Sequence, residues 1–162
     1  MKAHGTVHKY GDNVDTDVII PARYLNTADP AELAKKCMED IDADFVNRVK
    51  AGDIMVAGKN FGCGSSREQA PEVVKALGIS CVVAKSYARI FFRNAINNGL
   101  LLIENPDLYD EVTEGDSAEV TPGKEILYKG KKYEIASLPD NLLEILEAGG
   151  LVKAMRKRNG LS

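Results

Sequence analysis

Short apolar runs alternate with helical segments through the middle of this 162-residue chain. Residues 53–57, 80–84 and 100–103 are largely apolar stretches, which is typical of strands buried on both faces. Between them, residues 70–78 and 86–97 have the hydrophobic spacing and the terminal glycine of helices. The order β-α-β-α-β predicts a parallel sheet with right-handed crossover connections.

The segment that precedes this unit is less regular. Residues 2–10 alternate weakly and predict a first strand, and residues 14–21 place polar and acidic side chains directly before an apolar run that ends at Pro21. A long excursion over residues 22–52 follows. We expect helical turns within it at 30–38 and 44–49. The expected helix caps are Asp29 for the segment that begins at Pro30, and Ser86 for the later helix.

The carboxy-terminal third changes character. Residues 117–120, 125–128 and 131–135 predict short strands separated by tight turns at Pro122-Gly123 and Gly130. A helix is expected from the Asp140-Asn141 cap through Ala148, and then a last basic helix that runs to Arg158. The prediction is an α/β fold in one domain over residues 1–162. It has a mixed sheet core with flanking helices and a small antiparallel β addition.

Composition narrows the class of protein. Hydrophobic residues make up 44% of the chain and charged residues 28%, which is close to the globular average. The net charge of −3 gives no general attraction for nucleic acid. No apolar run approaches the roughly 18 residues of a membrane helix, and the amino terminus lacks the apolar stretch of a signal peptide. Three cysteines favour a reducing compartment, so a cytoplasmic protein is expected.

The candidate site is the segment Lys59-Asn60-Phe61-Gly62-Cys63-Gly64-Ser65-Ser66-Arg67-Glu68. It lies where a predicted strand passes into a predicted helix, and ligands of open α/β sheets bind at such junctions. The amino end of a helix offers free N–H groups and partial positive charge to an anion. Gly62 and Gly64 allow the backbone to approach a ligand closely. These residues indicate a site for a carboxylate or a phosphate.

Two other interpretations of this segment have to be weighed. It lacks the third glycine of a dinucleotide fingerprint and the Gly-Lys-Ser/Thr ending of a P-loop. Ser65-x-x-Glu68 has the form of a capping box, which would make the segment purely structural. Pro71 is comfortable only in the first turn of a helix, so the helix should begin between Arg67 and Ala70. The residues alone leave the functional and structural interpretations about even.

A functional serine here would need an unusual form of activation. A serine hydroxyl is a weak base or nucleophile until its alkoxide is stabilised or its proton is taken. His4 and His8 belong to the first predicted strand, with nothing that ties them to this segment. Activation would therefore be electrostatic, from Arg67 and backbone N–H groups. Arg67 is also suited to bidentate binding of a substrate carboxylate.

The remaining reactive residue types give weaker signals. Cys37, Cys63 and Cys81 have no spacing typical of a metal site, so no metal is expected on this chain. Cys37 and Cys81 are expected to be core thiols, and Cys63 alone has a position that suggests reactivity. Arg89 and Arg93, four residues apart, more often form a solvated or ion-paired helix face than a site.

Three motifs together resemble a known family. They are Val14-Asp15-Thr16-Asp17-Val18-Ile19-Ile20-Pro21, Asn60 to Glu68, and Ser86-Tyr87-Ala88-Arg89-Ile90-Phe91. Their sequence and order closely resemble the small subunits of 3-isopropylmalate dehydratase, which are similar to the swivelling carboxy-terminal domain of aconitase. The resemblance covers essentially the whole chain. It implies a swivelling β/β/α domain and a dehydration–rehydration reaction that converts 2-isopropylmalate to 3-isopropylmalate in leucine biosynthesis.

The resemblance also implies roles for individual residues. Ser66 would be the general base, and Arg67 would bind a substrate carboxylate and stabilise the serine alkoxide. Ser65 and Asp17 would line the site as hydrogen-bonding partners, with Gly64 at the substrate. Arg89 would brace the loop.

Substrate choice would reside in the excursion after Pro21, through Arg23, Tyr24, Leu25 and Asn26. Relatives that act on homoaconitate look to have an arginine after the Tyr-Leu pair, to hold an additional carboxylate. A neutral Asn26 would leave such a carboxylate unpaired, so an apolar isopropyl group fits better. Arg23 complicates this argument because it is close by. Dimethylmalate and citramalate or citraconate are also apolar at that position.

The resemblance places the [4Fe–4S] cluster in a separate large subunit, with which this chain would form a heterodimer or heterotetramer. No cofactor is expected on this chain itself. Two alternatives stay open. The first is the small subunit of a related hydro-lyase, acting on 2,3-dimethylmalate, citramalate or citraconate, or homoaconitate. The second is a non-catalytic module that binds an anion as a regulatory ligand.

Overall fold

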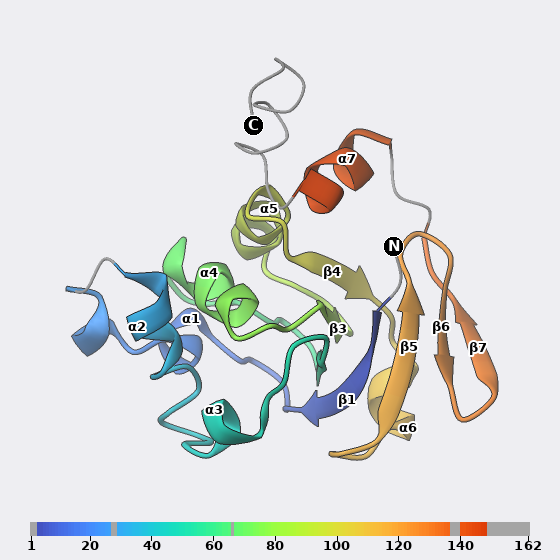
Figure 1. Ribbon diagram of the computed structural model, residues 1–162, viewed down its shortest axis with the longest axis horizontal. Coiled ribbons are helices and arrows are strands. Elements are labelled where there is room, and N and C mark those ends of the chain that lie inside the picture. Colours follow the sequence, from blue (N-terminus) through green and yellow to red (C-terminus); the bar gives the residue numbers. More distant parts are fainter. Residues whose placement is uncertain (1–2, 27–28, 66, 137–139, 149–162) are drawn as a thin grey trace.

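The computed structural model describes residues 3–26, 29–65, 67–136 and 140–148 (Figure 1). Its strands are Ala3–Lys9 (β1), Ile54–Ala57 (β2), Cys81–Ala84 (β3), Leu101–Glu104 (β4), Ser117–Thr121 (β5), Glu125–Tyr128 (β6) and Lys131–Glu134 (β7). Its helices are Thr16–Ile19 (α1), the 3₁₀ turn Ala22–Tyr24 (η1), Pro30–Ala34 (α2), Phe45–Arg48 (α3), Gln69–Ala76 (α4), Arg89–Asn97 (α5), Leu108–Glu111 (α6) and Asp140–Ala148 (α7).

The described strands form one seven-stranded sheet in the order β4-β3-β2-β1-β5-β6-β7. Strands β1 to β4 pair in parallel, whereas β1 pairs with β5, β5 with β6 and β6 with β7 in antiparallel fashion. The amino-terminal strand β1 is therefore the shared strand between a parallel half and an antiparallel half. This sheet confirms the predicted mixed core with an antiparallel addition.

The apolar strands of the parallel half are buried on both faces. Met55 and Val82 point into one hydrophobic cluster, with side chains of α1, α2, α4 and α5. Ile54 and Val83 point into a second cluster, with side chains of α6 and of the antiparallel half. Because successive side chains of a strand point to opposite faces, two-sided burial explains why these segments are continuously apolar.

The helices are distributed accordingly. Figure 1 shows α4 and α5 over the parallel half. Helix α6 packs against β2 and β3, and its Leu108 belongs to the second cluster. The loop that joins β2 to α4 and the loop that joins β3 to α5 both leave the same edge of the parallel strands, because β2 and β3 run in the same direction. Among the described residues, no helix is both long enough and apolar enough to cross a membrane.

Several predicted helix boundaries were wrong. The helix expected over residues 30–38 ends at Ala34, because Cys37 N–H donates to the Ala34 carbonyl and Met38 takes a left-handed φ of 62° to donate to the Ile19 carbonyl. Its predicted cap is confirmed, since the Asp29 side chain accepts a hydrogen bond from Ala31 N–H at 3.0 Å. Ser86 does not cap α5, which begins at Arg89 after Ala88.

Two further segments differ from the sequence prediction. Residues 14–21 contain the short helix α1, whose first turn is capped by the Asp15 carboxylate. The helix α6 was not predicted, since it is only four residues long and holds a single buried apolar side chain, Leu108. The basic helix expected to run to Arg158 lies outside the described residues.

Candidate active site

The loop between β2 and α4 is held on one side by the segment that leads into α1. Gly62 N–H donates to the Val14 carbonyl at 2.7 Å, and Thr16 N–H donates to the Cys63 carbonyl at 2.8 Å. The buried Thr16 hydroxyl then donates to the Ser65 carbonyl at 2.6 Å. These bonds explain why a threonine stands at the first position of α1.

The other side of the loop is held by the segment that leads into α5. Phe61 N–H donates to the Ser86 carbonyl at 3.0 Å, and Ala88 N–H donates to the Phe61 carbonyl at 3.0 Å. The Ser86 hydroxyl accepts from Asn60 N–H at 2.8 Å. The serine that looked like a helix cap therefore fixes the site loop instead.

Gly62 is required by a close approach of the loop to α5. Its φ is +83°, and a Cβ atom at this position would lie 2.2 Å from Cγ of Phe91. Phe91 is itself buried and packs edge-to-face on Phe61, with ring centroids 5.4 Å apart. The loop backbone can therefore lie against α5 only because residue 62 has no side chain.

The capping-box interpretation of the loop is wrong. Helix α4 begins at Gln69, within the interval that Pro71 allows. Glu68 occupies the cap position, but no side chain makes a capping hydrogen bond there. Ser65 is exposed and lies three residues before that cap. A structural role in starting α4 therefore does not account for the polar residues of the loop.

Arg67 and Asp17, which the resemblance assigns to the site, come together across the loop. Nη1 of Arg67 lies 3.0 Å from Oδ1 of Asp17 and 3.2 Å from the Ile20 carbonyl oxygen. The bond from Arg67, with a second from Ala22 N–H, holds the pKa of Asp17 below its ordinary value. The Arg67 side chain is 17% exposed, and its Nη2 and Nε make no hydrogen bond to any described residue. Within the described part of the chain, only one edge of the guanidinium group is thus fixed.

A pocket of about 340 Å³ opens beside this pair. Its floor includes Thr16, Gly62 and Gly64, and Arg67 borders it. The remaining lining residues come from the start of α5: Ala88, Arg89, Ile90, Phe91 and Asn94. The pocket therefore lies at the carboxyl ends of the parallel strands and combines basic groups with an apolar wall.

The residues predicted to select the substrate are next to this pocket but do not line it. Arg23 forms a two-pronged ion pair with Asp40, with contacts of 2.6 and 3.2 Å. Its guanidinium group is therefore already matched to a carboxylate. Tyr24 and Leu25 pack against the hydrophobic core, and Asn26 is exposed. The link to the site is Asp17, whose Oδ1 accepts hydrogen bonds from both Ala22 N–H and Arg67.

Ser66, the predicted base, lies outside the described residues, so the structure locates only its neighbours. Ser65 is fixed through its carbonyl by Thr16, and Arg67 is fixed by Asp17. Arg89, which was expected to brace the loop, makes no hydrogen bond or ion pair with the described residues.

The cysteines do not gather around the site. Cys37 and Cys81 are fully buried, and burial raises the pKa of Cys81 to about 12. Burial, followed by the negative charge of Asp15, also raises the pKa of Cys63, which argues against a reactive thiolate. Among the described residues, no three His, Cys, Asp or Glu side chains are placed to hold a metal ion. These donor groups do not fit an iron–sulfur cluster on the described part of this chain.

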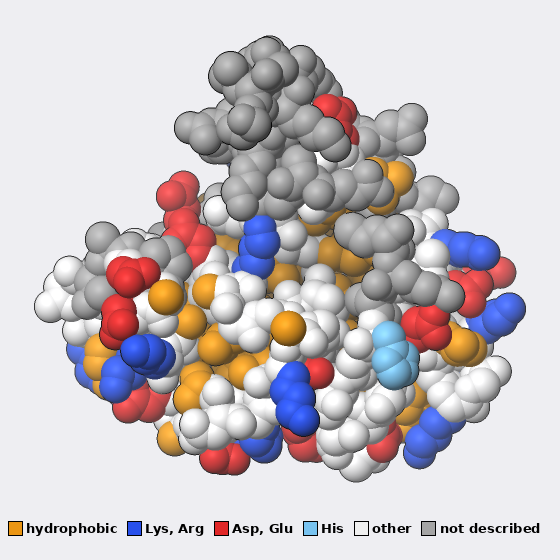
Figure 2. Space-filling model, in the orientation of Figure 1, with side chains coloured by type: hydrophobic (Ala, Val, Ile, Leu, Met, Phe, Trp, Pro, Cys, Tyr) orange, Lys and Arg blue, Asp and Glu red, His pale blue; other side chains and the backbone are white. Residues whose placement is uncertain are grey.

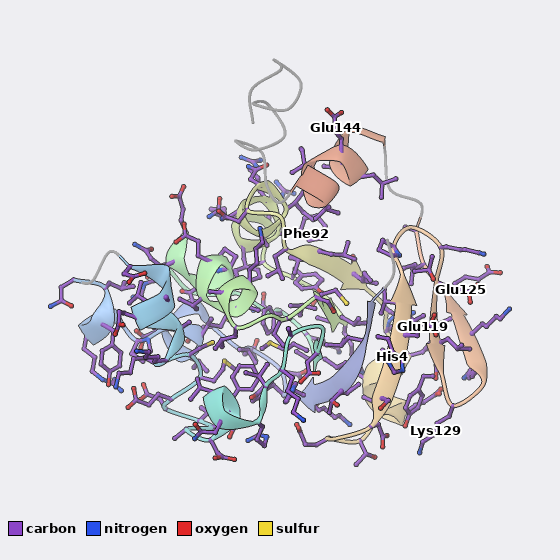
Figure 3. All side chains as sticks on the ribbon, in the orientation of Figure 1. His4, Phe92, Glu119, Glu125, Lys129 and Glu144 are labelled. Carbon is purple, nitrogen blue, oxygen red and sulfur yellow. The ribbon has the colours of Figure 1, made fainter. Side chains whose placement is uncertain are left out.

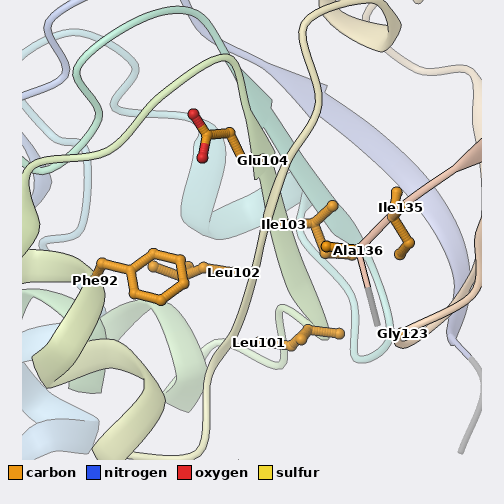
Figure 4. A pocket seen from close by; sticks show the side chains of 8 residues that line it. All are labelled: Phe92, Leu101, Leu102, Ile103, Glu104, Gly123, Ile135 and Ala136. Carbon is orange, nitrogen blue, oxygen red and sulfur yellow. The ribbon is translucent and has the colours of Figure 1, made fainter. Parts of the chain in front are cut away.

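One other pocket is less suited to an anionic ligand. A second pocket of about 170 Å³, shown in Figure 4, is lined mainly by apolar residues of β4 and of the segment after β7, with Glu104 its one charged residue. The face in Figure 2 shows basic and acidic side chains interspersed along its rim. Glu119, Glu125 and Lys129 lie on the antiparallel half, away from Phe92 on α5 (Figure 3).

Sequence reasoning did not assign Thr16, Phe91 or Asn94 to the site. Thr16 and Phe91 fix the loop, and Asn94 lines the pocket. Thr16 and Phe91 stand inside two of the motifs singled out above. Their roles depend on contacts between segments far apart in the chain, which no local pattern reveals.

Comparisons with known proteins agree on one family. A family model described as the aconitase C-terminal domain matches residues 32–108. A 3-isopropylmalate dehydratase small subunit from Lachnospira eligens is 62% identical over 99% of this chain and 98% of its own length. One from Lachnoclostridium phytofermentans is 58% identical over 98% of each chain. The crystal structure of a 3-isopropylmalate dehydratase from Methanocaldococcus jannaschii superimposes with a TM-score of 0.91 and 51% identity, over 98% of this chain and 96% of that one.

Proposed function

The chain belongs to the family of 3-isopropylmalate dehydratase small subunits, and from this premise we propose that it supplies one half of an active site that converts 2-isopropylmalate to 3-isopropylmalate. The conversion would serve leucine biosynthesis. The other half would come from a large subunit that carries a [4Fe–4S] cluster. The observation that carries the proposal is the fixed pair of Arg67 and Asp17 at the edge of a pocket with an apolar wall.

The reaction balances without an external oxidant or reductant. A proton leaves one carbon and a hydroxyl leaves the adjacent carbon, which gives an alkene and a water molecule. When water adds to the alkene in the opposite orientation, the hydroxyl binds the carbon that lost the proton, and a proton binds the carbon that lost the hydroxyl. In the partner, the cluster would supply the Lewis acidity that assists departure of the hydroxyl.

Ser66 would take the proton from carbon. The two histidines of the chain have other places: His8 is buried and hydrogen-bonded to Asp53 at 2.8 Å, and His4 lies on β1. The positive charge of Arg67, directly next in sequence, would lower the free energy of the serine alkoxide. Asp17 positions Arg67, and the free edge of its guanidinium group would bind a substrate carboxylate bidentately.

The geometry favours an apolar substrate branch over a third carboxylate. Arg23 is close enough in the sequence to bind a third carboxylate, but it is already ion-paired with Asp40. Asn26 is neutral, and Ile90 presents an apolar side chain that is 55% exposed at the pocket. Neither Asn26 nor Ile90 could pair with a third carboxylate, so burying one beside them would be unfavourable.

The test is isomerisation by the complex of this chain with an iron–sulfur large subunit, for instance that of Lachnospira eligens. We expect no activity from either chain alone. We expect a loss of about 100- to 1000-fold in kcat for Ser66→Ala, and a similar loss for Arg67→Lys, because lysine cannot form the fork with Asp17 and substrate. Parallel assays with dimethylmalate, citraconate and homoaconitate would identify a related hydro-lyase, if one of them were the better substrate.

A non-catalytic anion-binding module makes a different prediction. The isolated chain would then bind malonate or phosphate in a manner that requires Arg67, and Ser66→Ala would leave every measured turnover unchanged. Unchanged turnover in Ser66→Ala, measured in an active complex, would overturn the catalytic proposal.

A further inference from the structure

The pocket contains a second arginine that the proposal above does not use. Arg89, the first residue of α5, lines the same pocket as Arg67 and Gly64. The two arginines come from different elements, since Arg67 precedes α4 and Arg89 begins α5. The hydrogen bonds of Phe61 with Ser86 and Ala88 fix the loop that carries Arg67 to the segment that leads into α5.

The charges of the two arginines are not balanced in the same way. Arg67 is ion-paired with Asp17 at 3.0 Å. The other carboxylate next to the loop, Asp15, accepts a hydrogen bond from Val18 N–H at 2.9 Å and caps α1. Glu104 shares a neighbouring hollow with Arg89, yet no ion pair joins them within the described part of the chain. Among the described residues, Arg89 is therefore the arginine of this pocket that has no ion-pair partner.

The position of Arg89 is electrostatically unfavourable for helix α5. Arg89 stands in the first turn of α5, where the helix dipole disfavours a cation. Arg93 follows four residues later on the same helix, and like charges at this spacing repel one another. Both effects are unfavourable for folding, so the placement of Arg89 is better explained by what enters the pocket.

We infer that Arg89 binds a carboxylate of the substrate in this pocket, so that Arg67 and Arg89 together select a dicarboxylate. The inference rests on the proposed function and adds a binding residue to it. Ile90, which follows Arg89 in the sequence and also lines the pocket, provides the apolar surface against which the hydrocarbon branch of the substrate packs.

The experiment compares Arg89→Gln with Arg93→Gln in the complex with the large subunit. The control is closely matched: both residues are exposed arginines of α5, and either change relieves the same repulsion, but only Arg89 lines the pocket. A charge-assisted hydrogen bond contributes about 1.5–3 kcal/mol, so we expect kcat/KM for isopropylmalate to fall about 10- to 100-fold in Arg89→Gln. Arg93→Gln should change it less than about twofold, and Arg89→Lys should recover part of the loss because it keeps the charge.

Three outcomes are separated by this design. A wild-type complex that does not isomerise isopropylmalate contradicts the proposed function itself. An active wild type with equal kcat/KM in the two glutamine variants overturns the role of Arg89 alone. A loss in Arg89→Gln that disappears at saturating large subunit would place Arg89 in the subunit interface, which also overturns it. Support requires a loss that persists at saturation and is expressed mainly as a higher KM.

Discussion

Replacing Gly62 by alanine tests whether the close approach of the loop to α5 positions the site. The new Cβ would lie 2.2 Å from Cγ of Phe91 and 2.5 Å from its Cβ and Cδ1. Carbon atoms in contact are normally separated by about 3.5–4.0 Å, so Phe91 or the loop has to move by more than about 1 Å. Phe91 is 3% exposed and packs on Phe61, which leaves it little room to move.

The magnitude follows from two contributions. A non-glycine residue with left-handed φ loses about 1–2 kcal/mol, and overpacking of a buried site adds about 1–3 kcal/mol. Gly115 is a suitable control because its φ is +93° and a Cβ there would meet nothing within 4 Å. We therefore expect Gly115→Ala to show only the first contribution. Gly62→Ala should show both, a total of about 2–5 kcal/mol in the free energy of unfolding.

Urea unfolding of the two variants measures this difference directly, and the reconstituted enzyme measures its functional consequence. Gly62→Ala should lower kcat because Gly62 and Phe91 both line the pocket, whereas Gly115→Ala should not. Equal stability losses in the two variants would refute the reasoning, since they would show that Phe91 gives way freely. Normal activity in Gly62→Ala would show that the position of the loop does not matter to the reaction.

Three further predictions follow from other contacts. Thr16→Val removes the 2.6 Å hydrogen bond to the Ser65 carbonyl and should reduce the free energy of unfolding, measured with urea, by about 1 kcal/mol. It should also lower kcat of the complex in a steady-state assay. An unchanged kcat would contradict the positioning role of Thr16. Burial raises the pKa of Asp53, but its hydrogen bonds lower the pKa more, to a net value below the ordinary one. The stability that the ionised Asp53 contributes should therefore be present above a pH of about 4 and be lost as the pH falls further. The urea midpoint of Asp53→Asn should then approach that of the wild type at pH 3. A constant difference between the two midpoints from pH 7 to pH 3 would refute this. With a thiol reagent at pH 8, Cys63 should react more slowly than free cysteine, and the buried Cys37 and Cys81 should react only when the chain unfolds. Fast labelling of the folded chain would contradict these assignments.

The sequence predicted the sheet well because its signals are local. Strands β2 and β3 are buried on both faces, so continuous apolar runs identified them within a residue or two. The helix boundaries that failed depended on distant partners. The helix α2 does not extend to Met38, because the Met38 N–H donates to the Ile19 carbonyl. The Ser86 hydroxyl accepts a hydrogen bond from Asn60 N–H instead of capping α5.

The candidate site was predictable in part for the same reason. The glycine–serine–arginine motif indicated an anion site, and the position of Pro71 indicated a helix that begins between Arg67 and Ala70, as α4 does. The resemblance assigned both Arg67 and Asp17 to the site, and the structure joins them by a hydrogen bond. No sequence pattern showed that Arg23 is already paired with Asp40, or that Arg89 shares a pocket with Arg67. Both facts depend on packing between loops that are far apart in the chain.

The central claim is that this chain contributes Arg67, held by Asp17, to the active site of a two-subunit hydro-lyase. The most direct measurement is kcat for 2-isopropylmalate in the reconstituted complex, with wild type and Arg67→Lys compared at equal subunit occupancy. We predict an active wild-type complex and a loss of about 100-fold or more in the variant, with both separate subunits inactive. A variant as active as wild type, or turnover by the large subunit alone, would contradict the account.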